Sequence, residues 1–280
     1  MELCLMSVIY HYCDLNALLS IINNKKLWVS SAGNLNDYTE INYVRNIFVD
    51  SLNSKRNPSS DNVINEFITC FQGTFPHPYI CSFSKNKDLL SQWRAYAGDG
   101  CGVSIGFNTE AFGFSDTAPI LSMSNVHSIG INEVFYDDVE VICEFADRMS
   151  EAVTALSIHN ESDRWLGYNQ IASEVRTKCL FTKNKFFEEE QEVRIVHLPF
   201  VTGNDRGEFN VLHSISDLKQ RVTGNKITSY FEYDFSSKDN LIFDVVLGPK
   251  CEINEYEIEM LLASNGYLNI PVSRSGASYR

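Results

Sequence analysis

Short runs of apolar and polar residues predict a sheet whose strands are separated by helices. Residues 7–12 are rich in β-branched and aromatic side chains, as in a buried strand. Asp14, a residue type that caps helices, follows them, and residues 15–22 place their leucines and isoleucines at helical spacing. Residues 26–31 return to a strand pattern. The chain is therefore expected to begin as strand, helix, strand.

The same patterns continue along the rest of the chain. Strands are predicted at residues 79–84, 101–107, 189–198, 226–235, 240–248 and 270–274, with extended structure at 124–137. Helices are predicted from Thr39, over 87–98 and 254–266, and in one or two long segments from 139 to about 180. The polar stretch 53–62 is expected to be a mobile loop. Because strands and helices are mixed rather than strictly alternating, we expect an α+β fold, as one domain over residues 1–280 with a helical insertion at about 139–182.

Composition narrows the class of protein. The formal net charge of −13 argues against a protein that coats nucleic acid, which needs a basic surface. A local basic patch remains open in the acid-free stretch 176–185, which contains Arg176, Lys178, Lys183 and Lys185. The alternative is that this stretch is a solvated helix end.

Cysteine spacing and hydropathy point to the cellular compartment. The eight cysteines form no C-x-x-C pair and have no histidine at zinc-ligand spacing, so no metal is expected. Scattered single cysteines are typical of a reducing compartment. No apolar run approaches about 18 residues, and the N-terminus lacks the features of a signal peptide. We therefore expect a cytoplasmic protein without a membrane partner.

His11 lies on the first predicted strand, with Tyr10 and Tyr12 on the opposite face. An unpaired polar group on a buried strand costs roughly 1–3 kcal/mol, so the imidazole needs a partner. That partner is either a protein group in the core or a ligand.

A second group of polar residues lies at 186–196. Glu190, Glu192 and Arg194 would share one face of the predicted strand. If that face is buried, one carboxylate should have a raised pKa unless an arginine or a ligand hydroxyl compensates. The pattern suits hydrogen bonding to a sugar or general-base chemistry. The alternative is an edge strand whose charges prevent aggregation.

The segment 82–107 adds hydroxyl and aromatic groups. Ser82 and Ser84 share a strand face, and Trp93 and Tyr96 are three residues apart on a helix, where they could form an aromatic wall for a planar ring. The alternative is that both aromatics belong to the core. Motifs typical of Rossmann enzymes, P-loop enzymes, α/β-hydrolases and zincins are absent from the sequence.

Taken in order, these segments resemble a bacterial family catalogued as domain of unknown function 2971. The resemblance is carried by the Y-H-Y strand, "LNDYTE", "SFSKNKDLLSQWRAYAGDGCGVSIGF", "FFEEEQEVRIV", "LGPK" and "VSRSGASYR". It spans most of the chain and is weakest between about 110 and 175.

The layout also resembles the ADP-ribosyltransferase superfamily, which implies a mixed, split sheet and NAD as the substrate. By that resemblance Glu192 is the catalytic glutamate and Glu190 the first member of an E-x-E motif. The NAD-binding residues it implies are His11, Tyr12, Ser30, Ser82, Ser84, Trp93 and Tyr96. No metal is required.

The resemblance implies a glycosyltransferase that acts as a bacterial toxin or phage-defence effector and is held in check by an inhibitory antitoxin-type protein. The acceptor would be RNA, DNA or a protein, with Arg176, Lys178, Lys183 and Lys185 as the target-binding residues. Two alternatives stay open: an NAD glycohydrolase, and a non-catalytic module that binds a nucleotide or a partner.

Overall fold

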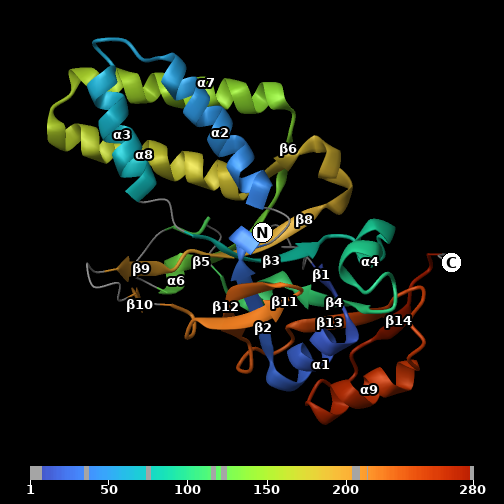
Figure 1. The fold of residues 1–280 in the computed structure, drawn as a ribbon. Helices are drawn as coiled ribbons and strands as arrows, with labels where there is room; N and C mark the ends of the chain where they lie inside the picture. Colours follow the sequence, from blue (N-terminus) through green and yellow to red (C-terminus); the bar gives the residue numbers. More distant parts are fainter. Residues whose placement is uncertain are drawn as a thin grey trace, which may run out of the picture.

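The chain folds into a large mixed sheet with long helices packed beside it (Figure 1). The computed structural model describes residues 8–34, 38–73, 77–114, 118–120, 125–203, 209–212 and 214–277. The strands are β1 (Val8–Cys13), β2 (Lys26–Ser31), β3 (Tyr79–Ser84), β4 (Val103–Asn108), β5 (Ile129–Glu133), β6 (Phe135–Asp137), β7 (Thr182–Asn184), β8 (Glu192–His197), β9 (Phe200–Gly203), β10 (Phe209–Leu212), β11 (Lys219–Thr223), β12 (Lys226–Asp234), β13 (Ile242–Leu247) and β14 (Val272–Arg274). The α-helices are α1 (Leu15–Asn24), α2 (Tyr38–Ser54), α3 (Asp61–Gly73), α4 (Leu90–Tyr96), α5 (Thr109–Phe112), α6 (Asn125–Ser128), α7 (Val139–Ala155), α8 (Glu161–Leu180) and α9 (Glu255–Ser264). The predicted α+β class is confirmed.

The main sheet forks at β3. Its strand order is β11-β12-β2-β3-β1-β4-β13-β14, and β8 pairs with the other edge of β3 and with β5. On the forked edge, Ile80 pairs with Ser30 of β2, whereas Ser84 pairs with Tyr10 of β1. β1 and β2 therefore take up opposite ends of the same edge and separate over the middle of β3. This gap gives side chains from several strands a common space.

Helix α1 connects the two strands that separate at the fork. Asp14 caps it, because its Oδ1 accepts a hydrogen bond of 2.8 Å from the backbone amide of Ala17. Leu18, Ile21 and Ile22 are buried against the sheet, as the helical spacing predicts. The core they join also includes buried residues of β3, β4, β12, β13 and α9.

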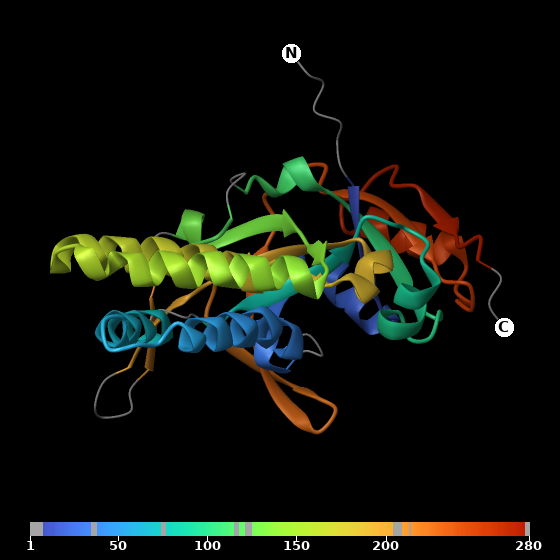
Figure 2. The same cartoon turned by 90° about the horizontal axis from the view of Figure 1, so that it is seen from above.

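Helices α2, α3, α7 and α8 form a separate layer with its own core (Figures 1 and 2). Figure 2 shows them side by side at the end of the molecule away from α9. The helical pattern predicted over 139–182 is confirmed as α7 and α8. Half of the layer comes from the N-terminal region, however, and α3 was not predicted. Its buried positions Val63, Ile64, Phe67, Cys70 and Phe71 follow helical spacing.

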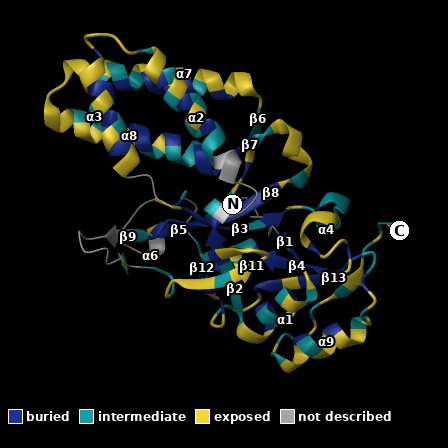
Figure 3. Cartoon of the chain, in the orientation of Figure 1, coloured by how far each residue is buried: buried dark blue, intermediate teal, exposed yellow. Residues whose placement is uncertain are grey.

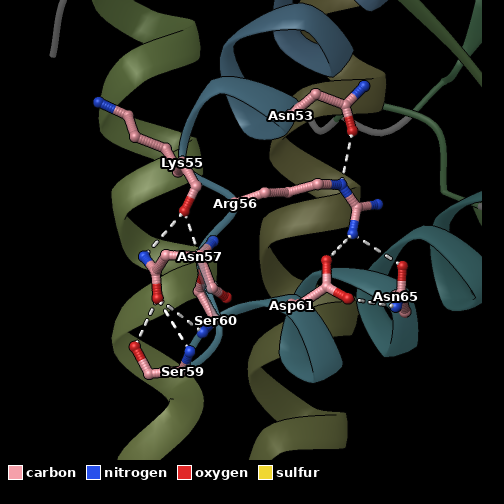
Figure 4. Close-up of polar contacts among 8 residues, drawn as sticks. All are labelled: Asn53, Lys55, Arg56, Asn57, Ser59, Ser60, Asp61 and Asn65. Carbon is pink, nitrogen blue, oxygen red and sulfur yellow. Dashed lines mark hydrogen bonds and ion pairs between the residues drawn. The ribbon is translucent and has the colours of Figure 1, made fainter.

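The segment predicted as a mobile loop, 53–62, contains the connection between α2 and α3. Asn57 organises it, since its Oδ1 accepts hydrogen bonds from the backbone amides of Ser59 and Ser60 at 3.0 and 3.1 Å (Figure 4). Arg56 bonds Asn53 at 3.0 Å and also reaches Asp61 and Asn65 at the start of α3. Polar side chains, which made the stretch look unstructured, here satisfy the ends of two helices.

Burial is greatest in the strands around the fork (Figure 3). All six residues of β8 are buried, and so are all six of β4. The seven described cysteines are free thiols. Within the described ranges, no helix is both long and apolar enough to cross a membrane.

Candidate functional site

A cavity of about 410 Å³ lies at the fork of the sheet, a volume in the range of small-molecule sites. Its walls come from β1, α1, β2, β3, α4, β11 and the segment that leads into β8. Seven of the residues predicted for the site line it: His11, Tyr12, Ser30, Ser82, Tyr96, Glu190 and Glu192. Parts of the chain that are far apart in sequence therefore meet at one concave surface.

His11 spans the gap between β1 and β3. Its Nδ1 lies 3.0 Å from the carbonyl oxygen of Ser82, which can only accept, so Nδ1 carries the proton. Burial lowers the pKa of His11; the bond to Ser82 raises it, and nearby Arg221 lowers it further. The ring is therefore neutral at pH 7, and its Nε2 is an acceptor. The imidazole therefore has a protein partner, as one of the two alternatives predicts, and it also lines the cavity.

Glu192 is held by two cations. Its Oε1 accepts from Nε of Arg194 at 2.7 Å, and its Oε2 accepts from Nη2 of Arg194 at 3.0 Å and lies 2.9 Å from Nζ of Lys183. Burial acts to raise the pKa of Glu192, but Arg194 and Lys183 outweigh it and lower that pKa to about 2. The carboxylate is ionised at neutral pH. Three donors occupy three of its roughly four acceptor positions, which leaves one for a ligand.

Glu190 does not lie on the strand with Glu192. It ends a 3-10 helix at Lys185–Glu190, and Gln191, in a left-handed conformation with φ of 45°, separates the two glutamates. The shared strand face predicted for Glu190, Glu192 and Arg194 is therefore wrong for Glu190. Lys183 nevertheless joins the two carboxylates, because its Nζ lies 2.8 Å from Oε2 of Glu190. The alternative of a charged edge strand is also wrong, since β8 pairs on both sides.

The three predicted serines have different positions. Ser82 lines the cavity and accepts the His11 bond through its backbone. Ser84 is buried; its Oγ donates to the carbonyl oxygen of Glu190 at 2.7 Å, so it holds the segment before β8. Ser30 lines the cavity, and its Oγ accepts from Nη2 of Arg221 at 3.1 Å.

The predicted aromatic wall of Trp93 and Tyr96 is not formed. Trp93 is fully buried in a small core with Tyr12, and its Nε1 donates to Asp88 at 2.7 Å. Only Tyr96 lines the cavity, with 45% of its surface exposed. The helix is a single short one, and its buried side is taken up by Trp93. A planar ring could therefore stack on Tyr96 alone.

Tyr12 contributes to the wall of the cavity with its hydroxyl group already bonded. The hydroxyl donates to the carbonyl oxygen of Asn86 at 2.8 Å and accepts from the amide of Leu89 at 2.9 Å. These bonds join β1 to the start of α4. Tyr12 thus positions the helix that carries Tyr96.

The four residues predicted to bind the target lie in different environments. Lys183 is buried beneath the two glutamates, and Arg176 is half-buried with its Nε bonded to the carbonyl of Ala172. Lys178 pairs with Asp137 at 2.5 Å, and exposed Lys185 pairs with Asp138 at 3.1 Å. Only Lys185 is an exposed cation, so the four do not form a shared basic surface.

Two wall residues were missed by the sequence reasoning. Arg221 on β11 and Trp28 on β2 face the cavity, with the guanidinium carbon 4.7 Å from the centroid of the Trp28 ring. The β11–β12 hairpin that carries Arg221 was detectable, because residues 219–223 and 226–234 are separated by the two-residue turn Gly224-Asn225. Nothing in the local pattern, however, predicted that the hairpin would reach the fork.

The arrangement combines a neutral imidazole acceptor, an ionised carboxylate with one free position, an exposed tyrosine ring and an arginine. Such a wall can hold a polar ligand with hydroxyl groups, a planar ring and an anionic group. Within the described ranges, no cluster of three or more side chains suited to a metal ion was found.

Comparison with known protein families gives a match over part of the chain. Residues 92–195 match a family described as "Protein of unknown function (DUF2971)". This region runs from Gln92 in α4 to Ile195 in β8 and includes Tyr96, Glu190 and Glu192, but not His11 or Arg221. No curated protein and no solved structure matches the chain.

Proposed function

We propose that the cavity binds NAD and that the chain is an ADP-ribosyltransferase with a domain of that superfamily's type. The observation that supports this most directly is the fork at β3, through which His11 of β1 and Glu192 of β8 line one cavity. A split sheet with these two residue types in the cleft is what the sequence resemblance implies.

The chemistry uses groups present in the cavity. The bond between the nicotinamide nitrogen and C1′ of the ribose breaks, and its electron pair leaves with nicotinamide. The positive charge that develops on the ribose is stabilised by an ionised carboxylate, and the effect is greater in a buried site. Glu192 meets this need, because Arg194 and Lys183 keep it deprotonated. The acceptor then forms a bond to C1′ and loses a proton to water or to a nearby base.

His11 and Tyr96 would hold the substrate. The Nε2 lone pair of His11 can accept a hydrogen bond from a ribose hydroxyl or from the carboxamide of nicotinamide. The exposed ring of Tyr96 can stack on nicotinamide, which keeps C1′ open to an acceptor on the other side.

In a bacterial cell such an enzyme would act in the cytoplasm as a toxin or phage-defence effector, restrained by an inhibitory protein. The acceptor is RNA, DNA or a protein side chain. NAD is a substrate, and this reaction needs no metal.

The test uses NAD labelled on the adenylate group, incubated separately with total RNA, DNA and cell lysate. The wild-type chain is expected to label one pool and to release nicotinamide, and Glu192→Gln to do neither. Expression of the wild type alone should also arrest bacterial growth, with relief by the same substitution.

Glu192→Gln needs controls, because it removes the partner of two buried cations. Glu66→Gln is matched to it: Glu66 accepts from Arg164 at 3.1 Å and from Tyr168 at 2.9 Å in the helical layer, away from the cavity. It should keep activity. Tyr96→Ala, at an exposed position, should reduce labelling without a change in melting temperature. Intact NAD in every wild-type reaction would contradict the proposal, and free nicotinamide without labelled acceptor would favour a glycohydrolase.

A second candidate function is a non-catalytic module that binds a nucleotide. It is favoured by the fact that Arg194 and Lys183 already bond the Glu192 carboxylate. In that case NAD or ADP binds to the wild type and remains intact, and Glu192→Gln changes the stability of the protein rather than any activity.

A further inference from the structure

Arg221 enters the cavity from the β11–β12 hairpin and is held there by aromatic rings. Its guanidinium carbon lies 4.7 Å from the centroid of Trp28 and 5.8 Å from that of Tyr230. The two rings themselves lie 4.7 Å apart, on neighbouring strands β2 and β12. Stacking of this kind fixes the plane of a guanidinium and leaves its N–H edge free to donate. The side chain is thus positioned before any ligand arrives.

No described residue balances the charge of Arg221. Nη2 donates to the neutral hydroxyl of Ser30, and no described carboxylate lies within ion-pair distance of the guanidinium. Its Nε is buried and has no hydrogen-bond partner among the described residues. A buried donor without a partner is unfavourable by roughly 1–3 kcal/mol, which an incoming acceptor would remove.

The other charged side chains that line the cavity differ in this respect. Lys26 pairs with Glu232 at 2.8 Å, and the two lining carboxylates, Glu190 and Glu192, pair with Lys183 and Arg194 beneath them. Arg221 therefore stands out among the described cavity-lining residues as a cation without an anion. It shares the cavity wall with His11 and Cys81, neither of which carries a negative charge: burial raises the pKa of the Cys81 thiol to about 12, although Arg221 acts to lower it.

We infer that Arg221, stacked on Trp28 and Tyr230, binds a phosphate group of the ligand that occupies the cavity. Arginine presents a fork of N–H donors that matches the oxygens of a phosphate. The ligand class is therefore a nucleotide rather than a nucleoside or an uncharged sugar. This inference rests on the proposed function only in taking the cavity at the fork as the ligand site, and it holds whether or not NAD is cleaved.

The geometry also orients the ligand. Arg221 and Ser30 lie on the β2 side of the fork, whereas Glu192 lies on the β8 side, on the opposite edge of β3. A phosphate at Arg221 would place the sugar that follows it toward His11 and Glu192. The cavity would thus distinguish the two ends of its ligand by charge.

The test is a binding series by calorimetry with phosphate, pyrophosphate, ADP and adenosine, on the wild type and on Arg221→Gln, Arg221→Lys and Lys226→Gln. Lys226→Gln removes a positive charge from the exposed end of the same hairpin and serves as the matched control. Arg221→Gln is expected to weaken ADP binding by about tenfold to a hundredfold, because hydrogen bonds to a charged group contribute about that much to affinity. It should leave adenosine binding unchanged. Arg221→Lys should restore part of the ADP affinity, because it keeps the charge and loses the planar fork.

The outcomes separate this inference from the proposed function. If ADP binds through Arg221 while NAD stays intact, the transferase proposal fails and the phosphate site stands. If Arg221→Gln binds ADP as tightly as the wild type, or loses ADP and adenosine equally, the phosphate site is wrong even where the transferase is active. Free phosphate could also bind as tightly as ADP. That result would identify an anion site without nucleotide selectivity and would overturn the ligand class.

Discussion

Glu192 and Arg194, two residues apart on β8, are joined inside the protein by hydrogen bonds of 2.7 and 3.0 Å. Both side chains are buried, on a strand paired on both sides. Arg194 also donates to the carbonyl of Leu180 at 2.9 Å, so it connects the end of α8 to the sheet. One side of the pair thus supports the helical layer, and the other faces the cavity.

Arg194→Gln should destabilise the protein strongly. The substitution leaves the Glu192 carboxylate with Lys183 as its charged partner, and removal of one member of a buried pair typically costs about 3–5 kcal/mol. The free energy of unfolding in urea measures this. Lys185→Gln is the control, because exposed Lys185 pairs with Asp138 at the surface and its loss should cost less than about 1 kcal/mol. Equal effects of the two substitutions would show that Arg194 adds nothing beyond a surface pair.

Tyr96→Ala should weaken NAD binding without a loss of stability. The ring is 45% exposed and lines the cavity, and an aromatic stack contributes about 0.5–1.5 kcal/mol, or roughly threefold to tenfold in affinity. Titration of the variant with NAD, together with its melting temperature, tests this. Tyr256→Ala on α9 removes a ring that is 60% exposed and outside the cavity, and its affinity for NAD should match the wild type.

Stability should fall between about pH 6.5 and pH 4 through His197. Burial lowers the pKa of this histidine to about 4, and the bond from Nδ1 to the Ser128 carbonyl opposes the shift only in part. Well above pH 6.5 the ring is neutral in both states. As the pH falls, His197 binds a proton in the unfolded chain but not in the folded chain. The free energy of unfolding therefore falls by about 3 kcal/mol.

Unfolding measured from pH 8 to pH 4 on the wild type and on His197→Asn checks this, with the variant expected to show a shallower slope. The contribution of Glu192 falls in a lower window, because a lowered carboxylate pKa costs stability only as the pH drops from about 4.5 toward 2. An unchanged slope in His197→Asn would assign the effect to other histidines.

Gly102→Ala should destabilise the turn between α4 and β4. A Cβ at Gly102 would lie 2.2 Å from the carbonyl oxygen of Cys13, so backbones would have to move apart, at a cost of about 1–3 kcal/mol. Gly73→Ala, at the end of α3, meets no atom within 4 Å and should be neutral or slightly stabilising. Chemical unfolding of the two variants in parallel gives the comparison.

The sequence was most informative where one local rule dominates. Asp14 and the spacing of α1 predicted that helix, and the alternation of β-branched and aromatic residues predicted β1, β3 and β12. It was less informative where polar residues serve structure. The side chains of residues 55–60 look like those of a free loop, but they make the hydrogen bonds of the α2–α3 connection.

The sequence predicted several of the residues that line the cavity better than it predicted how they are arranged. His11, Tyr96 and Glu192 line the same cavity, but Trp93 does not. Three-residue spacing on a helix predicts that two side chains are neighbours, but it does not predict which of them is buried. Lys183 looked like a surface cation within a basic stretch. Only the fold shows that it lies under Glu190 and Glu192, since that contact depends on how β7 and β8 approach each other.

The fork at β3 has a consequence for folding. The strands that meet there pair with distant parts of the chain: β3 pairs with β8 through Ser84 and Glu192, β2 with β12, and β1 with β4. Long loops must close before any of these pairings forms, so the sheet should assemble slowly and with high contact order. The helical layer also depends on contacts between distant segments, because α2 packs mainly on α7 and α8. The cavity is complete only when β1, β2, β3, α4, β11 and the segment before β8 have all come together. We therefore expect the cavity to be among the last parts of the protein to form.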